Sequence, residues 1–332
     1  MALRVGILGA AKIAGSFMVG AKASGRIETV AVASRDRARG EAFAADHGIA
    51  RVCGYDELLA DPAIDAIYNP LPNNMHAAWS IAAARAGKHV LCEKPLAFGE
   101  AEAAEMFAAA EAAGVVLVEA FPYWFQPQTL ALERLIHGGA IGEVRLMLAT
   151  FGFTMTAASH AGNIRLDPAR GGGALLDAGC YPVSWARQVF GARPTRVSAV
   201  AQWTGGVDQT LAATLEFPGG GLAQISCSFA TALHRQSIIM GSAGVIETDY
   251  HNHTDREPAP AYRIRRGIDA GAAFETVAVP RENGFKVEID AFAELVERRE
   301  APEARAQLAA RRAASLDVAW TLQAILDAAR PS

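Results

Sequence analysis

The sequence is poor in several features that mark whole classes of protein. Only four of its 332 residues are cysteines, and none stands in a C-x-x-C pair, which fits a reducing compartment with cysteine as a core residue. No apolar run approaches the roughly 20 residues that a membrane span requires. The formal net charge of −4 gives no general excess of positive charge, so binding to nucleic-acid phosphates is not expected.

Signals for export, for a serine hydrolase and for a metal site are missing as well. Residues Leu3–Leu8 have the composition of a first strand and no signal peptide precedes them, so the expected location is cytoplasmic. Gly-x-Ser-x-Gly is absent, which removes support for a hydrolase nucleophile elbow. His251 and His253 could ligate a metal, but we expect a polar loop there and predict no metal.

The residues that are abundant form two successive patterns. The chain is 51% hydrophobic and 20% charged, and its length allows two domains. Over the first ~120 residues, short apolar runs alternate with alanine-rich amphipathic stretches, which is typical of βα units and a doubly wound parallel sheet. The strands predicted there are Arg4–Leu8, Thr29–Ser34, Ala50–Cys53, Ala63–Tyr68, Lys88–Cys92 and Val115–Glu119.

After Phe121 the pattern changes to strands joined by glycine turns, which favours hairpins and a large, mostly antiparallel sheet. We therefore predict an α/β dinucleotide-binding domain over residues 1–122 and an α+β domain over 123–332, with the helices of 287–329 packing back. The strands expected in the second half are Glu143–Phe151, Thr195–Trp203, Gln209–Phe217, Leu222–Ala230, Arg235–Met240 and Val245–Asp249. The helices expected are Thr129–His137, Ala174–Phe190, Val287–Arg299 and Glu303–Ala329.

Small residues follow the first predicted strand at the spacing of a dinucleotide-binding turn. Gly9, Ala11 and Ala14 match the G-x-G-x-x-G/A fingerprint, with alanine in place of its second glycine. Gly9 allows the tight turn, and the backbone of Ala11, Lys12 and Ile13 brings a helix N-terminus to the pyrophosphate. The alternative is an alanine-rich turn that binds no ligand.

The end of the second predicted strand bears on which dinucleotide binds. Ser34 stands where an NAD enzyme normally has Asp or Glu. Arg35 and Arg39 follow, and their guanidinium groups match the geometry of a 2′-phosphate. NADP is therefore the predicted cofactor, and NAD is the alternative if Asp36 binds the ribose hydroxyl instead.

A lysine stands where a parallel sheet is expected to hold its ligand. Glu93 and Lys94 directly follow a predicted strand, and open parallel sheets bind ligands beyond the carboxyl ends of their strands. Lys94 could there donate to a substrate hydroxyl or move a proton. The alternative is a lysine in a solvated loop.

A carboxylate and a phenol share one helix face in the second half. Asp177 and Tyr181 are four residues apart and follow the triple glycine Gly171–Gly173. Gly179 and Pro182 are expected to loosen or kink that helix, because proline cannot donate a backbone hydrogen bond. The structural alternative is a helix start with a capped Asp177 and a half-buried Tyr181.

These motifs together resemble the glucose–fructose oxidoreductase, inositol dehydrogenase and MocA (Gfo/Idh/MocA) family over nearly the whole chain. The resemblance rests on the Gly9 turn, on Pro72-Asn73-x-x-His76, on Glu93-Lys94-Pro95 and on the segment Gly171–Tyr181. Asn163–Pro168 and Asp177–Pro182 look most like the branch of dimeric dihydrodiol dehydrogenase and NADP-dependent xylose dehydrogenase. The family implies a Rossmann domain and an open-faced C-terminal sheet that builds a homodimer or homotetramer.

The resemblance also implies roles for individual residues. Tyr181 is expected to be the general acid/base, Lys94 its partner that lowers the phenol pKa, and Asp177 the group that fixes the substrate hydroxyl or the lysine. Many relatives have histidine at position 181, so the division of labour between Lys94 and Tyr181 is left open.

Further contacts are implied with the cofactor and the substrate. Besides the turn and the strand end, the residues expected at the cofactor are Pro72, Asn73, His76, Glu93 and Lys94, with a helix-capping role as the alternative for His76. Besides the catalytic group, the residues expected at the substrate are Trp124, Asn163 and Arg165. Trp124 stands where close relatives tend to have arginine, and a place in the core is the favoured alternative for it.

The predicted function is an NADP(H)-dependent oxidoreductase that moves hydride between nicotinamide and a C–OH or C=O group of a pyranose sugar or a cyclic trans-diol. One alternative is a redox-silent regulator that binds nucleotide and sugar on the same fold. Another is a glycosidase that uses tightly held NAD. The sequence leaves the substrate, the reaction direction and the oligomer number open.

Overall fold

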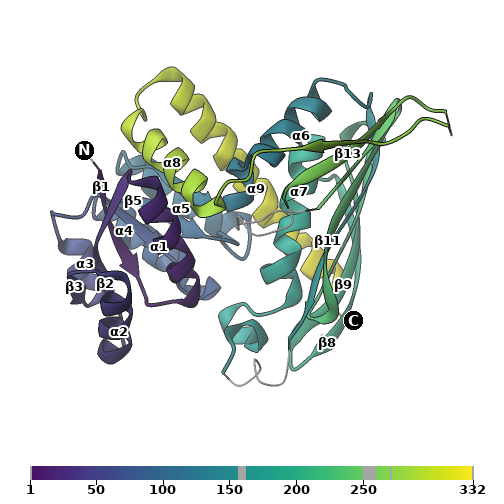
Figure 1. The fold of residues 1–332 in the computed structure, drawn as a ribbon. Coiled ribbons are helices and arrows are strands. Elements are labelled where there is room, and N and C mark those ends of the chain that lie inside the picture. Colours follow the sequence, from purple (N-terminus) through teal and green to yellow (C-terminus); the bar gives the residue numbers. More distant parts are fainter. Residues whose placement is uncertain (1, 156–161, 250–258, 270, 331–332) are drawn as a thin grey trace.

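The computed structural model describes residues 2–155, 162–249, 259–269 and 271–330, and they form two sheets with helices packed around them (Figure 1). The first sheet has six parallel strands in the order β3-β2-β1-β4-β5-β6. Its strands are β1 (Leu3–Leu8), β2 (Ile27–Ala33), β3 (Arg51–Cys53), β4 (Ala66–Asn69), β5 (His89–Glu93) and β6 (Leu117–Ala120). The predicted doubly wound parallel sheet is therefore confirmed.

The strand order of the first sheet determines where a ligand can bind. The order reverses between β1 and β4, and in open α/β sheets the crevice at such a switch point receives the ligand. Strands β4 and β6 are buried along their whole length, because helices cover both faces of the sheet. The helices of this half are α1 (Lys12–Ser24), α2 (Arg37–His47), α3 (Tyr55–Ala60), α4 (His76–Arg85) and α5 (Glu100–Ala112).

The second sheet has eight strands, and all its pairings are antiparallel except that of β7 with β10. Along β10, buried side chains alternate with exposed ones over the first four residues, as expected for a sheet with one covered face. Its strands are β7 (Val144–Thr154), β8 (Arg196–Thr204), β9 (Val207–Glu216), β10 (Leu222–Ser228), β11 (Ala230–Gly241), β12 (Gly244–Thr248), β13 (Ala261–Arg266) and β14 (Glu275–Ala278). The predicted open-faced, mostly antiparallel sheet is confirmed, but β13 and β14 were not predicted.

The remaining α-helices follow in the second half of the chain. They are α6 (Pro127–His137), α7 (Cys180–Phe190), α8 (Gly284–Glu297) and α9 (Pro302–Ala329). Helix α8 packs closely on α1, because a Cβ atom on Gly20 would come within 2.8 Å of the Phe285 backbone. Helix α9 contacts α5 and β6 of the first half as well as α7 and β8 of the second (Figure 1).

The helix expected over Ala174–Phe190 contains the predicted irregularity. Residues Leu175–Gly179 form a π-helical turn, and the regular helix α7 starts only at Cys180. Pro182 cannot donate to the carbonyl of Ala178, so the backbone widens at this point instead of continuing as an α-helix. The wide turn carries Asp177 into the site described below.

The sequence predicted neither a membrane span nor a metal site, and the described residues bear on both. Among them, no helix is both long and apolar enough to cross a membrane. They also contain no group of three potential metal ligands. His251 and His253 lie outside the described residues.

Candidate active site

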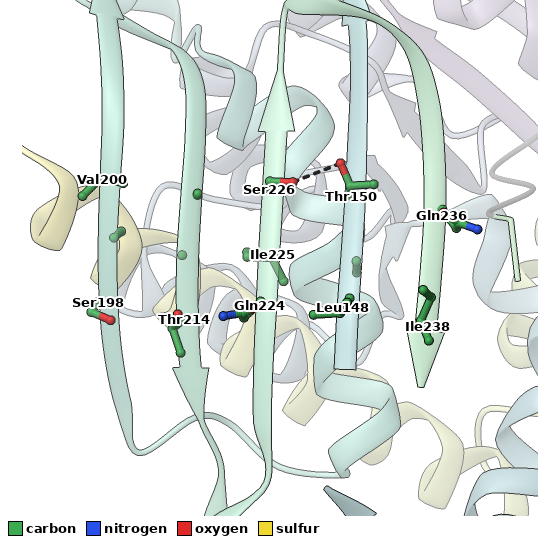
Figure 2. Close-up of a pocket in the computed structure, with 14 residues that line it drawn as sticks. Leu148, Thr150, Ser198, Val200, Thr214, Gln224, Ile225, Ser226, Gln236 and Ile238 are labelled. Carbon is green, nitrogen blue, oxygen red and sulfur yellow. Dashed lines mark hydrogen bonds between the residues drawn. The ribbon is translucent and has the colours of Figure 1, made fainter. Parts of the chain in front are cut away.

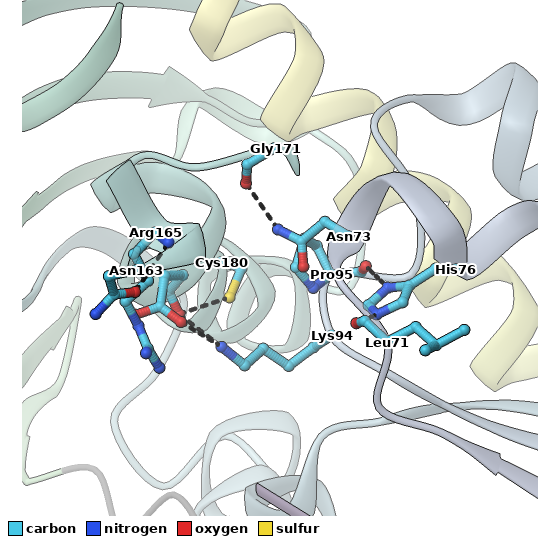
Figure 3. Close-up of polar contacts among 10 residues, drawn as sticks. Leu71, Asn73, His76, Lys94, Pro95, Asn163, Arg165, Gly171 and Cys180 are labelled. Carbon is cyan, nitrogen blue, oxygen red and sulfur yellow. Dashed lines mark hydrogen bonds and ion pairs between the residues drawn. The ribbon is translucent and has the colours of Figure 1, made fainter. Parts of the chain in front are cut away.

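Lys94 connects the two halves of the molecule. It follows β5, its bond to Pro95 is cis, and its side chain reaches towards the segment that contains Cys180 (Figure 3). Lys94 Nζ donates to the backbone oxygen of Asp177 at 2.8 Å and to Asp177 Oδ1 at 3.3 Å. Only 13% of the lysine side chain and 20% of the aspartate side chain are exposed, so water screens this ion pair weakly.

Tyr181 also lies close to the lysine ammonium. Lys94 Nζ is 5.0 Å from the centroid of the Tyr181 ring, and the rings of Phe121 and Phe151 pack at 5.5 Å from it. No hydrogen bond joins the Tyr181 hydroxyl to another residue of the described ranges. The structure therefore brings the lysine, the carboxylate and the phenol together, as the sequence predicted, and leaves the hydroxyl available for a substrate oxygen.

Arg165 binds the far side of Asp177. Its Nε donates to Asp177 Oδ2 at 2.6 Å, while Asn163 accepts from the Arg165 backbone N–H at 3.0 Å and so begins the short turn Ile164–Leu166. The triple glycine holds this loop in place, since Gly173 N–H donates to the Arg165 carbonyl and a Cβ on Gly172 would lie 2.5 Å from it. Arg165 thus contacts the carboxylate directly, and Asn163 shapes the loop.

Burial and mutual attraction shift the pKa values of this cluster. Burial alone would raise the pKa of Asp177, but Lys94 and Arg165 outweigh it and lower the value. Burial lowers the pKa of Lys94, but a Tyr181 phenolate and Asp177 outweigh it and raise the value. The lysine is therefore an ammonium and the aspartate a carboxylate near neutral pH.

The predicted direction of the Tyr181 pKa is wrong. Lys94 does favour the phenolate, as expected, but burial of the ring disfavours the charged form more strongly, and the net effect raises the pKa of Tyr181. In the described structure Tyr181 is thus a neutral phenol, suited to donating a proton.

His76 braces the loops around Lys94. It is 1% exposed, and its ring nitrogens lie 2.9 Å from the Pro95 carbonyl oxygen and 2.7 Å from that of Leu71 (Figure 3). Burial lowers the pKa of His76 to about 4, so the ring is neutral and its single N–H serves one carbonyl at a time. His76 therefore joins the loops that follow β4 and β5, and neither capping nor a free ring for cofactor contact fits this geometry.

Asn73 and Glu93, which stand in the same family motifs as His76 and Lys94, also have hydrogen-bond partners. Asn73, which follows Pro72, donates to the Gly171 carbonyl at 2.8 Å and so joins the first half to the triple glycine. Glu93 is 7% exposed and accepts from the Tyr68 hydroxyl at 2.6 Å, on the face of the sheet that α1 and α8 cover. This position turns Glu93 away from the expected cofactor contact.

The turn after β1 fits a dinucleotide phosphate. Gly9 has φ +94°, which an L-residue rarely adopts, and Ala14 is completely buried against the sheet. Ala11 is the N-cap of the 13-residue helix α1 and makes no side-chain capping bond, so the N–H groups of Lys12 and Ile13 start a helix without a protein cap. Such a helix N-terminus attracts a phosphate.

The end of β2 fits the 2′-phosphate better than the free hydroxyl. Arg39 Nε donates to the Ala10 carbonyl at 3.0 Å, which places its guanidinium at the phosphate turn, and Arg35, four residues earlier, is exposed. Asp36, the alternative ligand of the ribose hydroxyl, accepts from Arg39 N–H as the cap of α2. Ser34 donates to the Asp36 carbonyl at 2.6 Å.

One predicted substrate residue lies in the core, and one nearby cation was missed. Trp124 is 0% exposed and donates to Ser184 Oγ at 2.8 Å, so the core alternative holds and sugar stacking does not fit. Arg235, which the sequence analysis did not select, lies 5.6 Å above the Phe151 ring. An arginine at the start of the predicted strand Arg235–Met240 was the available signal, but its neighbour on another strand depends on the sheet register.

Comparisons with known proteins find similar proteins for both halves of the chain. Residues 3–121 match the oxidoreductase family with an NAD-binding Rossmann fold, and residues 129–247 match the GFO/IDH/MocA C-terminal domain. D-xylose 1-dehydrogenase (NADP(+)) 2 of Haloferax volcanii is 37% identical over 98% of this chain and 96% of that protein. Trans-1,2-dihydrobenzene-1,2-diol dehydrogenase of Danio rerio is 37% identical over 76% of this chain and 75% of that protein.

A solved structure matches over almost the full length. It is KijD10, a 3-ketoreductase from Actinomadura kijaniata in complex with NADP and TDP-benzene, with a TM-score of 0.89 and 32% identity. The match covers 99% of this chain and 98% of that chain.

Proposed function

The chain belongs to the Gfo/Idh/MocA family of oxidoreductases, and from this premise we propose that it is an NADP(H)-dependent oxidoreductase acting on a pyranose sugar or a cyclic trans-diol. The observation that carries the proposal is the convergence of Lys94, Asp177 and Tyr181 beyond the end of β5. The named activities of the relatives, a xylose dehydrogenase, a dihydrodiol dehydrogenase and a sugar ketoreductase, support the substrate class.

The residues of the site would donate or accept the proton of the reaction. A bound nicotinamide supplies or accepts the hydride. In carbonyl reduction, the neutral Tyr181 hydroxyl donates a proton to the substrate oxygen while the Lys94 ammonium stabilises the charge that develops there. Asp177 orients Lys94, and Arg165 holds Asp177. In the oxidation of an alcohol the same groups accept the proton, which requires the Tyr181 phenolate.

The preference for NADP over NAD is part of the proposal. Arg35 and Arg39 lie where the 2′-phosphate of a dinucleotide on this turn would be, and Asp36 is used as a helix cap. The NADP named for the Haloferax relative and for the KijD10 complex supports the same cofactor.

A substrate panel tests the proposal against its rivals. The protein with NADP is mixed separately with aldoses, inositols and trans-dihydrodiols, and the nicotinamide absorbance is followed. We expect NADPH to form with at least one substrate and to accumulate in proportion to time. Stabilisation by a sugar without any change in absorbance would favour the regulator, and release of a sugar product without net cofactor turnover would favour the glycosidase.

We also propose a homodimer or homotetramer formed through the open face of the second sheet. That face has a hollow of about 650 Å³, where Leu148, Val200 and Ile238 lie among polar side chains (Figure 2). Val200 is 72% exposed within this hollow, so its apolar side chain is accessible to a second copy of the chain. Sedimentation of the protein and of Val200→Lys should give a dimer or tetramer and a smaller species, respectively.

Two further proposals concern the location of the protein and the division of the chain. All four cysteines, Cys53, Cys92, Cys180 and Cys227, are buried and free, which supports a cytoplasmic location. The division of the chain at residue 122 stays a prediction.

A further inference from the structure

We propose that Asp208 is a positioning residue for the proton-transfer site. Its carboxylate caps the helical turn Leu175–Gly179, which carries Asp177 into contact with Lys94. The inference rests on the proposed function, because it concerns the geometry of that same site. Asp208 stands on β9, and no motif of the sequence analysis includes it.

The start of the helical turn has no capping side chain of its own. Gly173 precedes the helical residues, and its carbonyl accepts from the Asp177 N–H at 3.3 Å, but glycine has no side chain that could bind the free N–H groups. Asp208 supplies the missing acceptor from β9, because its Oδ2 accepts from the Leu175 N–H at 2.7 Å in a buried position. The carboxylate therefore takes the place of an N-cap side chain.

The backbone of Gly173 leaves the space that this carboxylate occupies. Gly173 has φ +122°, a conformation that residues with a side chain rarely adopt, and a Cβ atom there would collide with Asp208 Oδ1. The contact with Asp208 thus accounts for the third residue of the triple glycine, as the Arg165 carbonyl accounts for the second.

An irregularity of the second sheet directs Asp208 inwards. Trp203 and Gln202 of β8 pair with Asp208 and Thr210 of β9, so β9 has one extra residue at this point. Such a β-bulge changes the direction in which side chains point. Val207 and Asp208 are accordingly both buried, although successive residues of a regular strand face opposite sides, and Asp208 is only 1% exposed.

Backbone groups stabilise the charge of Asp208. Burial raises the pKa of Asp208 to about 6, and the N–H groups of Leu175, Ala174 and Asp208 itself oppose that shift. Burial, and then the charge of Asp208, raise the pKa of Cys227, so this neighbouring thiol stays neutral. At neutral pH, Asp208 is therefore a carboxylate at the start of a helix, where the peptide dipoles favour a negative charge.

The capped turn is the one that meets the lysine. Asp177 follows Leu175 by two residues, and both its backbone oxygen and its Oδ1 accept from Lys94 Nζ, at 2.8 and 3.3 Å. The Tyr181 ring centroid lies 5.0 Å from the same ammonium. A π-helical turn is rare and short in proteins, so a bond that fixes the start of this turn also determines where the carboxylate and the phenol lie.

Two substitutions of Asp208 and one control test this role. Asp208→Ala removes the acceptor, whereas Asp208→Asn keeps one neutral oxygen that can accept from the Leu175 N–H. Asn283→Ala removes the side-chain cap of α8, which accepts from the Lys286 N–H at 3.1 Å, and is the matched loss of a cap away from the site. A general loss of stability is common to the two alanine variants.

The kinetic test separates positioning from cofactor binding. The measured quantities are kcat and KM for the substrate with the fastest NADP⁺ reduction in the panel above, and the NADPH dissociation constant by fluorescence titration, all well below each Tm. We expect Asp208→Ala to lower kcat by about 10- to 100-fold, because a misplacement of about 1 Å can cost that much. NADPH affinity should stay the same, Asp208→Asn should lie between the alanine variant and the wild type in kcat, and Asn283→Ala should keep the wild-type kcat.

Amide hydrogen exchange gives a second readout that needs no substrate. In the NADP-loaded protein, peptides that cover residues 174–181 should exchange faster in Asp208→Ala than in the wild type, because the turn has lost its cap. Asn283→Ala should speed exchange only near the start of α8.

The outcomes separate this inference from the proposed function. A kcat of Asp208→Ala no lower than that of Asn283→Ala overturns the inference and leaves the oxidoreductase proposal standing. A parallel loss of kcat and NADPH affinity also overturns it, because a general structural defect affects both. If the alanine variant does not fold, Asp208→Asn carries the test, and an unchanged kcat there overturns the inference.

If no sugar or diol is oxidised or reduced, the proposed function fails, and the exchange measurement still decides this inference. Faster exchange over residues 174–181 in Asp208→Ala then supports the capping role, and unchanged exchange there overturns it.

Discussion

The two halves of this protein position their site residues in different ways. The first sheet is parallel, so the carboxyl ends of all its strands lie at one edge, and the Gly9 turn and Lys94 both lie at that edge. The second has one open face, and its contribution comes from a widened helical turn that carries Asp177 and from the start of α7, which carries Tyr181. Regular topology places the cation and the cofactor turn, whereas a local irregularity places the carboxylate and the phenol.

This contrast predicts that the first half determines whether chemistry is possible and the second determines how the proton moves. The largest effect is expected from Lys94→Met, which removes the ammonium and leaves Asp177 and Tyr181 without their common partner. We expect kcat to fall by about 10²–10⁴-fold. Lys22→Met, which removes an exposed lysine on α1, is the matched control and should keep full activity. Normal turnover of Lys94→Met would contradict the assignment.

The second prediction concerns the phenol. Tyr181→Phe keeps the aromatic packing but removes the hydroxyl, so kcat should fall by about 10²-fold or more. Because burial raises the Tyr181 pKa, the wild-type oxidation rate should rise as pH increases towards the phenolate, while the reduction rate stays nearly constant around neutral pH. The variant should lose this rise.

A matched phenol separates chemistry from stability. The ring centroids of Tyr123 and Tyr181 are 5.8 Å apart, but the Tyr123 hydroxyl donates to Ser184 Oγ at 2.7 Å. Tyr123→Phe should therefore lower the free energy of unfolding by about 1 kcal/mol and leave the pH profile unchanged. If both variants alter the pH profile in the same way, the assignment of proton transfer to Tyr181 is wrong.

The third prediction concerns the cofactor in the first half. Arg39→Ala removes the guanidinium at the phosphate turn, so NADP should bind about tenfold or more weakly while NAD affinity stays the same. Arg37→Ala, on the same helix, removes an arginine that pairs with Glu41 and should change neither affinity. Fluorescence titration of bound NADPH and NADH measures both, and tighter binding of NAD than of NADP by the wild type would overturn the cofactor preference.

The smallest expected effect concerns a buried carboxyl behind the site. Glu288 on α8 is 0% exposed, and neither carboxyl oxygen has a hydrogen-bond partner in the described structure. Burial and the nearby Glu93 raise the pKa of Glu288 in the folded state. The protonated Glu288 therefore stabilises the folded state fully at low pH, and this stabilisation is lost as pH rises above the ordinary pKa of about 4.3.

An amide at this position avoids the ionisation. Glu288→Gln should therefore gain about 1–3 kcal/mol over the wild type at pH 8 and much less at pH 5, as measured by urea unfolding. Glu294→Gln, on the exposed side of the same helix, should show no such pH dependence. A gain that is independent of pH would mean that Glu288 does not ionise over this range.

What the sequence could predict follows the same division between the sheets. The six parallel strands, the Gly9 turn and the position of Lys94 were predictable because apolar runs and glycine spacing reflect local structure. Strands β13 and β14 were missed because they are short and lie at a sheet edge, and β13 carries three arginines. Arg235 was missed for a different reason, since its neighbour Phe151 belongs to a strand that only the register brings near.

The sign of one pKa could not be predicted either. A sequence shows that Lys94 can approach Tyr181, but it does not show how deeply the ring is buried, and here burial is the larger effect. Trp124 illustrates the same point, because the same aromatic residue can line a sugar site or fill a core, and only its 0% exposure decides.

The long helix α9 has a consequence for motion. With 28 residues it extends about 42 Å, and it rests on α5 and β6 at the nucleotide side and on α7 and β8 at the sheet side. Arg312 pairs with Glu111 of α5, while Asp317 holds Arg187 of α7. Because α9 is bound to both halves, it opposes a wide hinge opening between them. A small displacement of one half along the axis of α9 would disturb fewer of these contacts. Entry and exit of a dinucleotide should therefore proceed by a small shear of one half past the other.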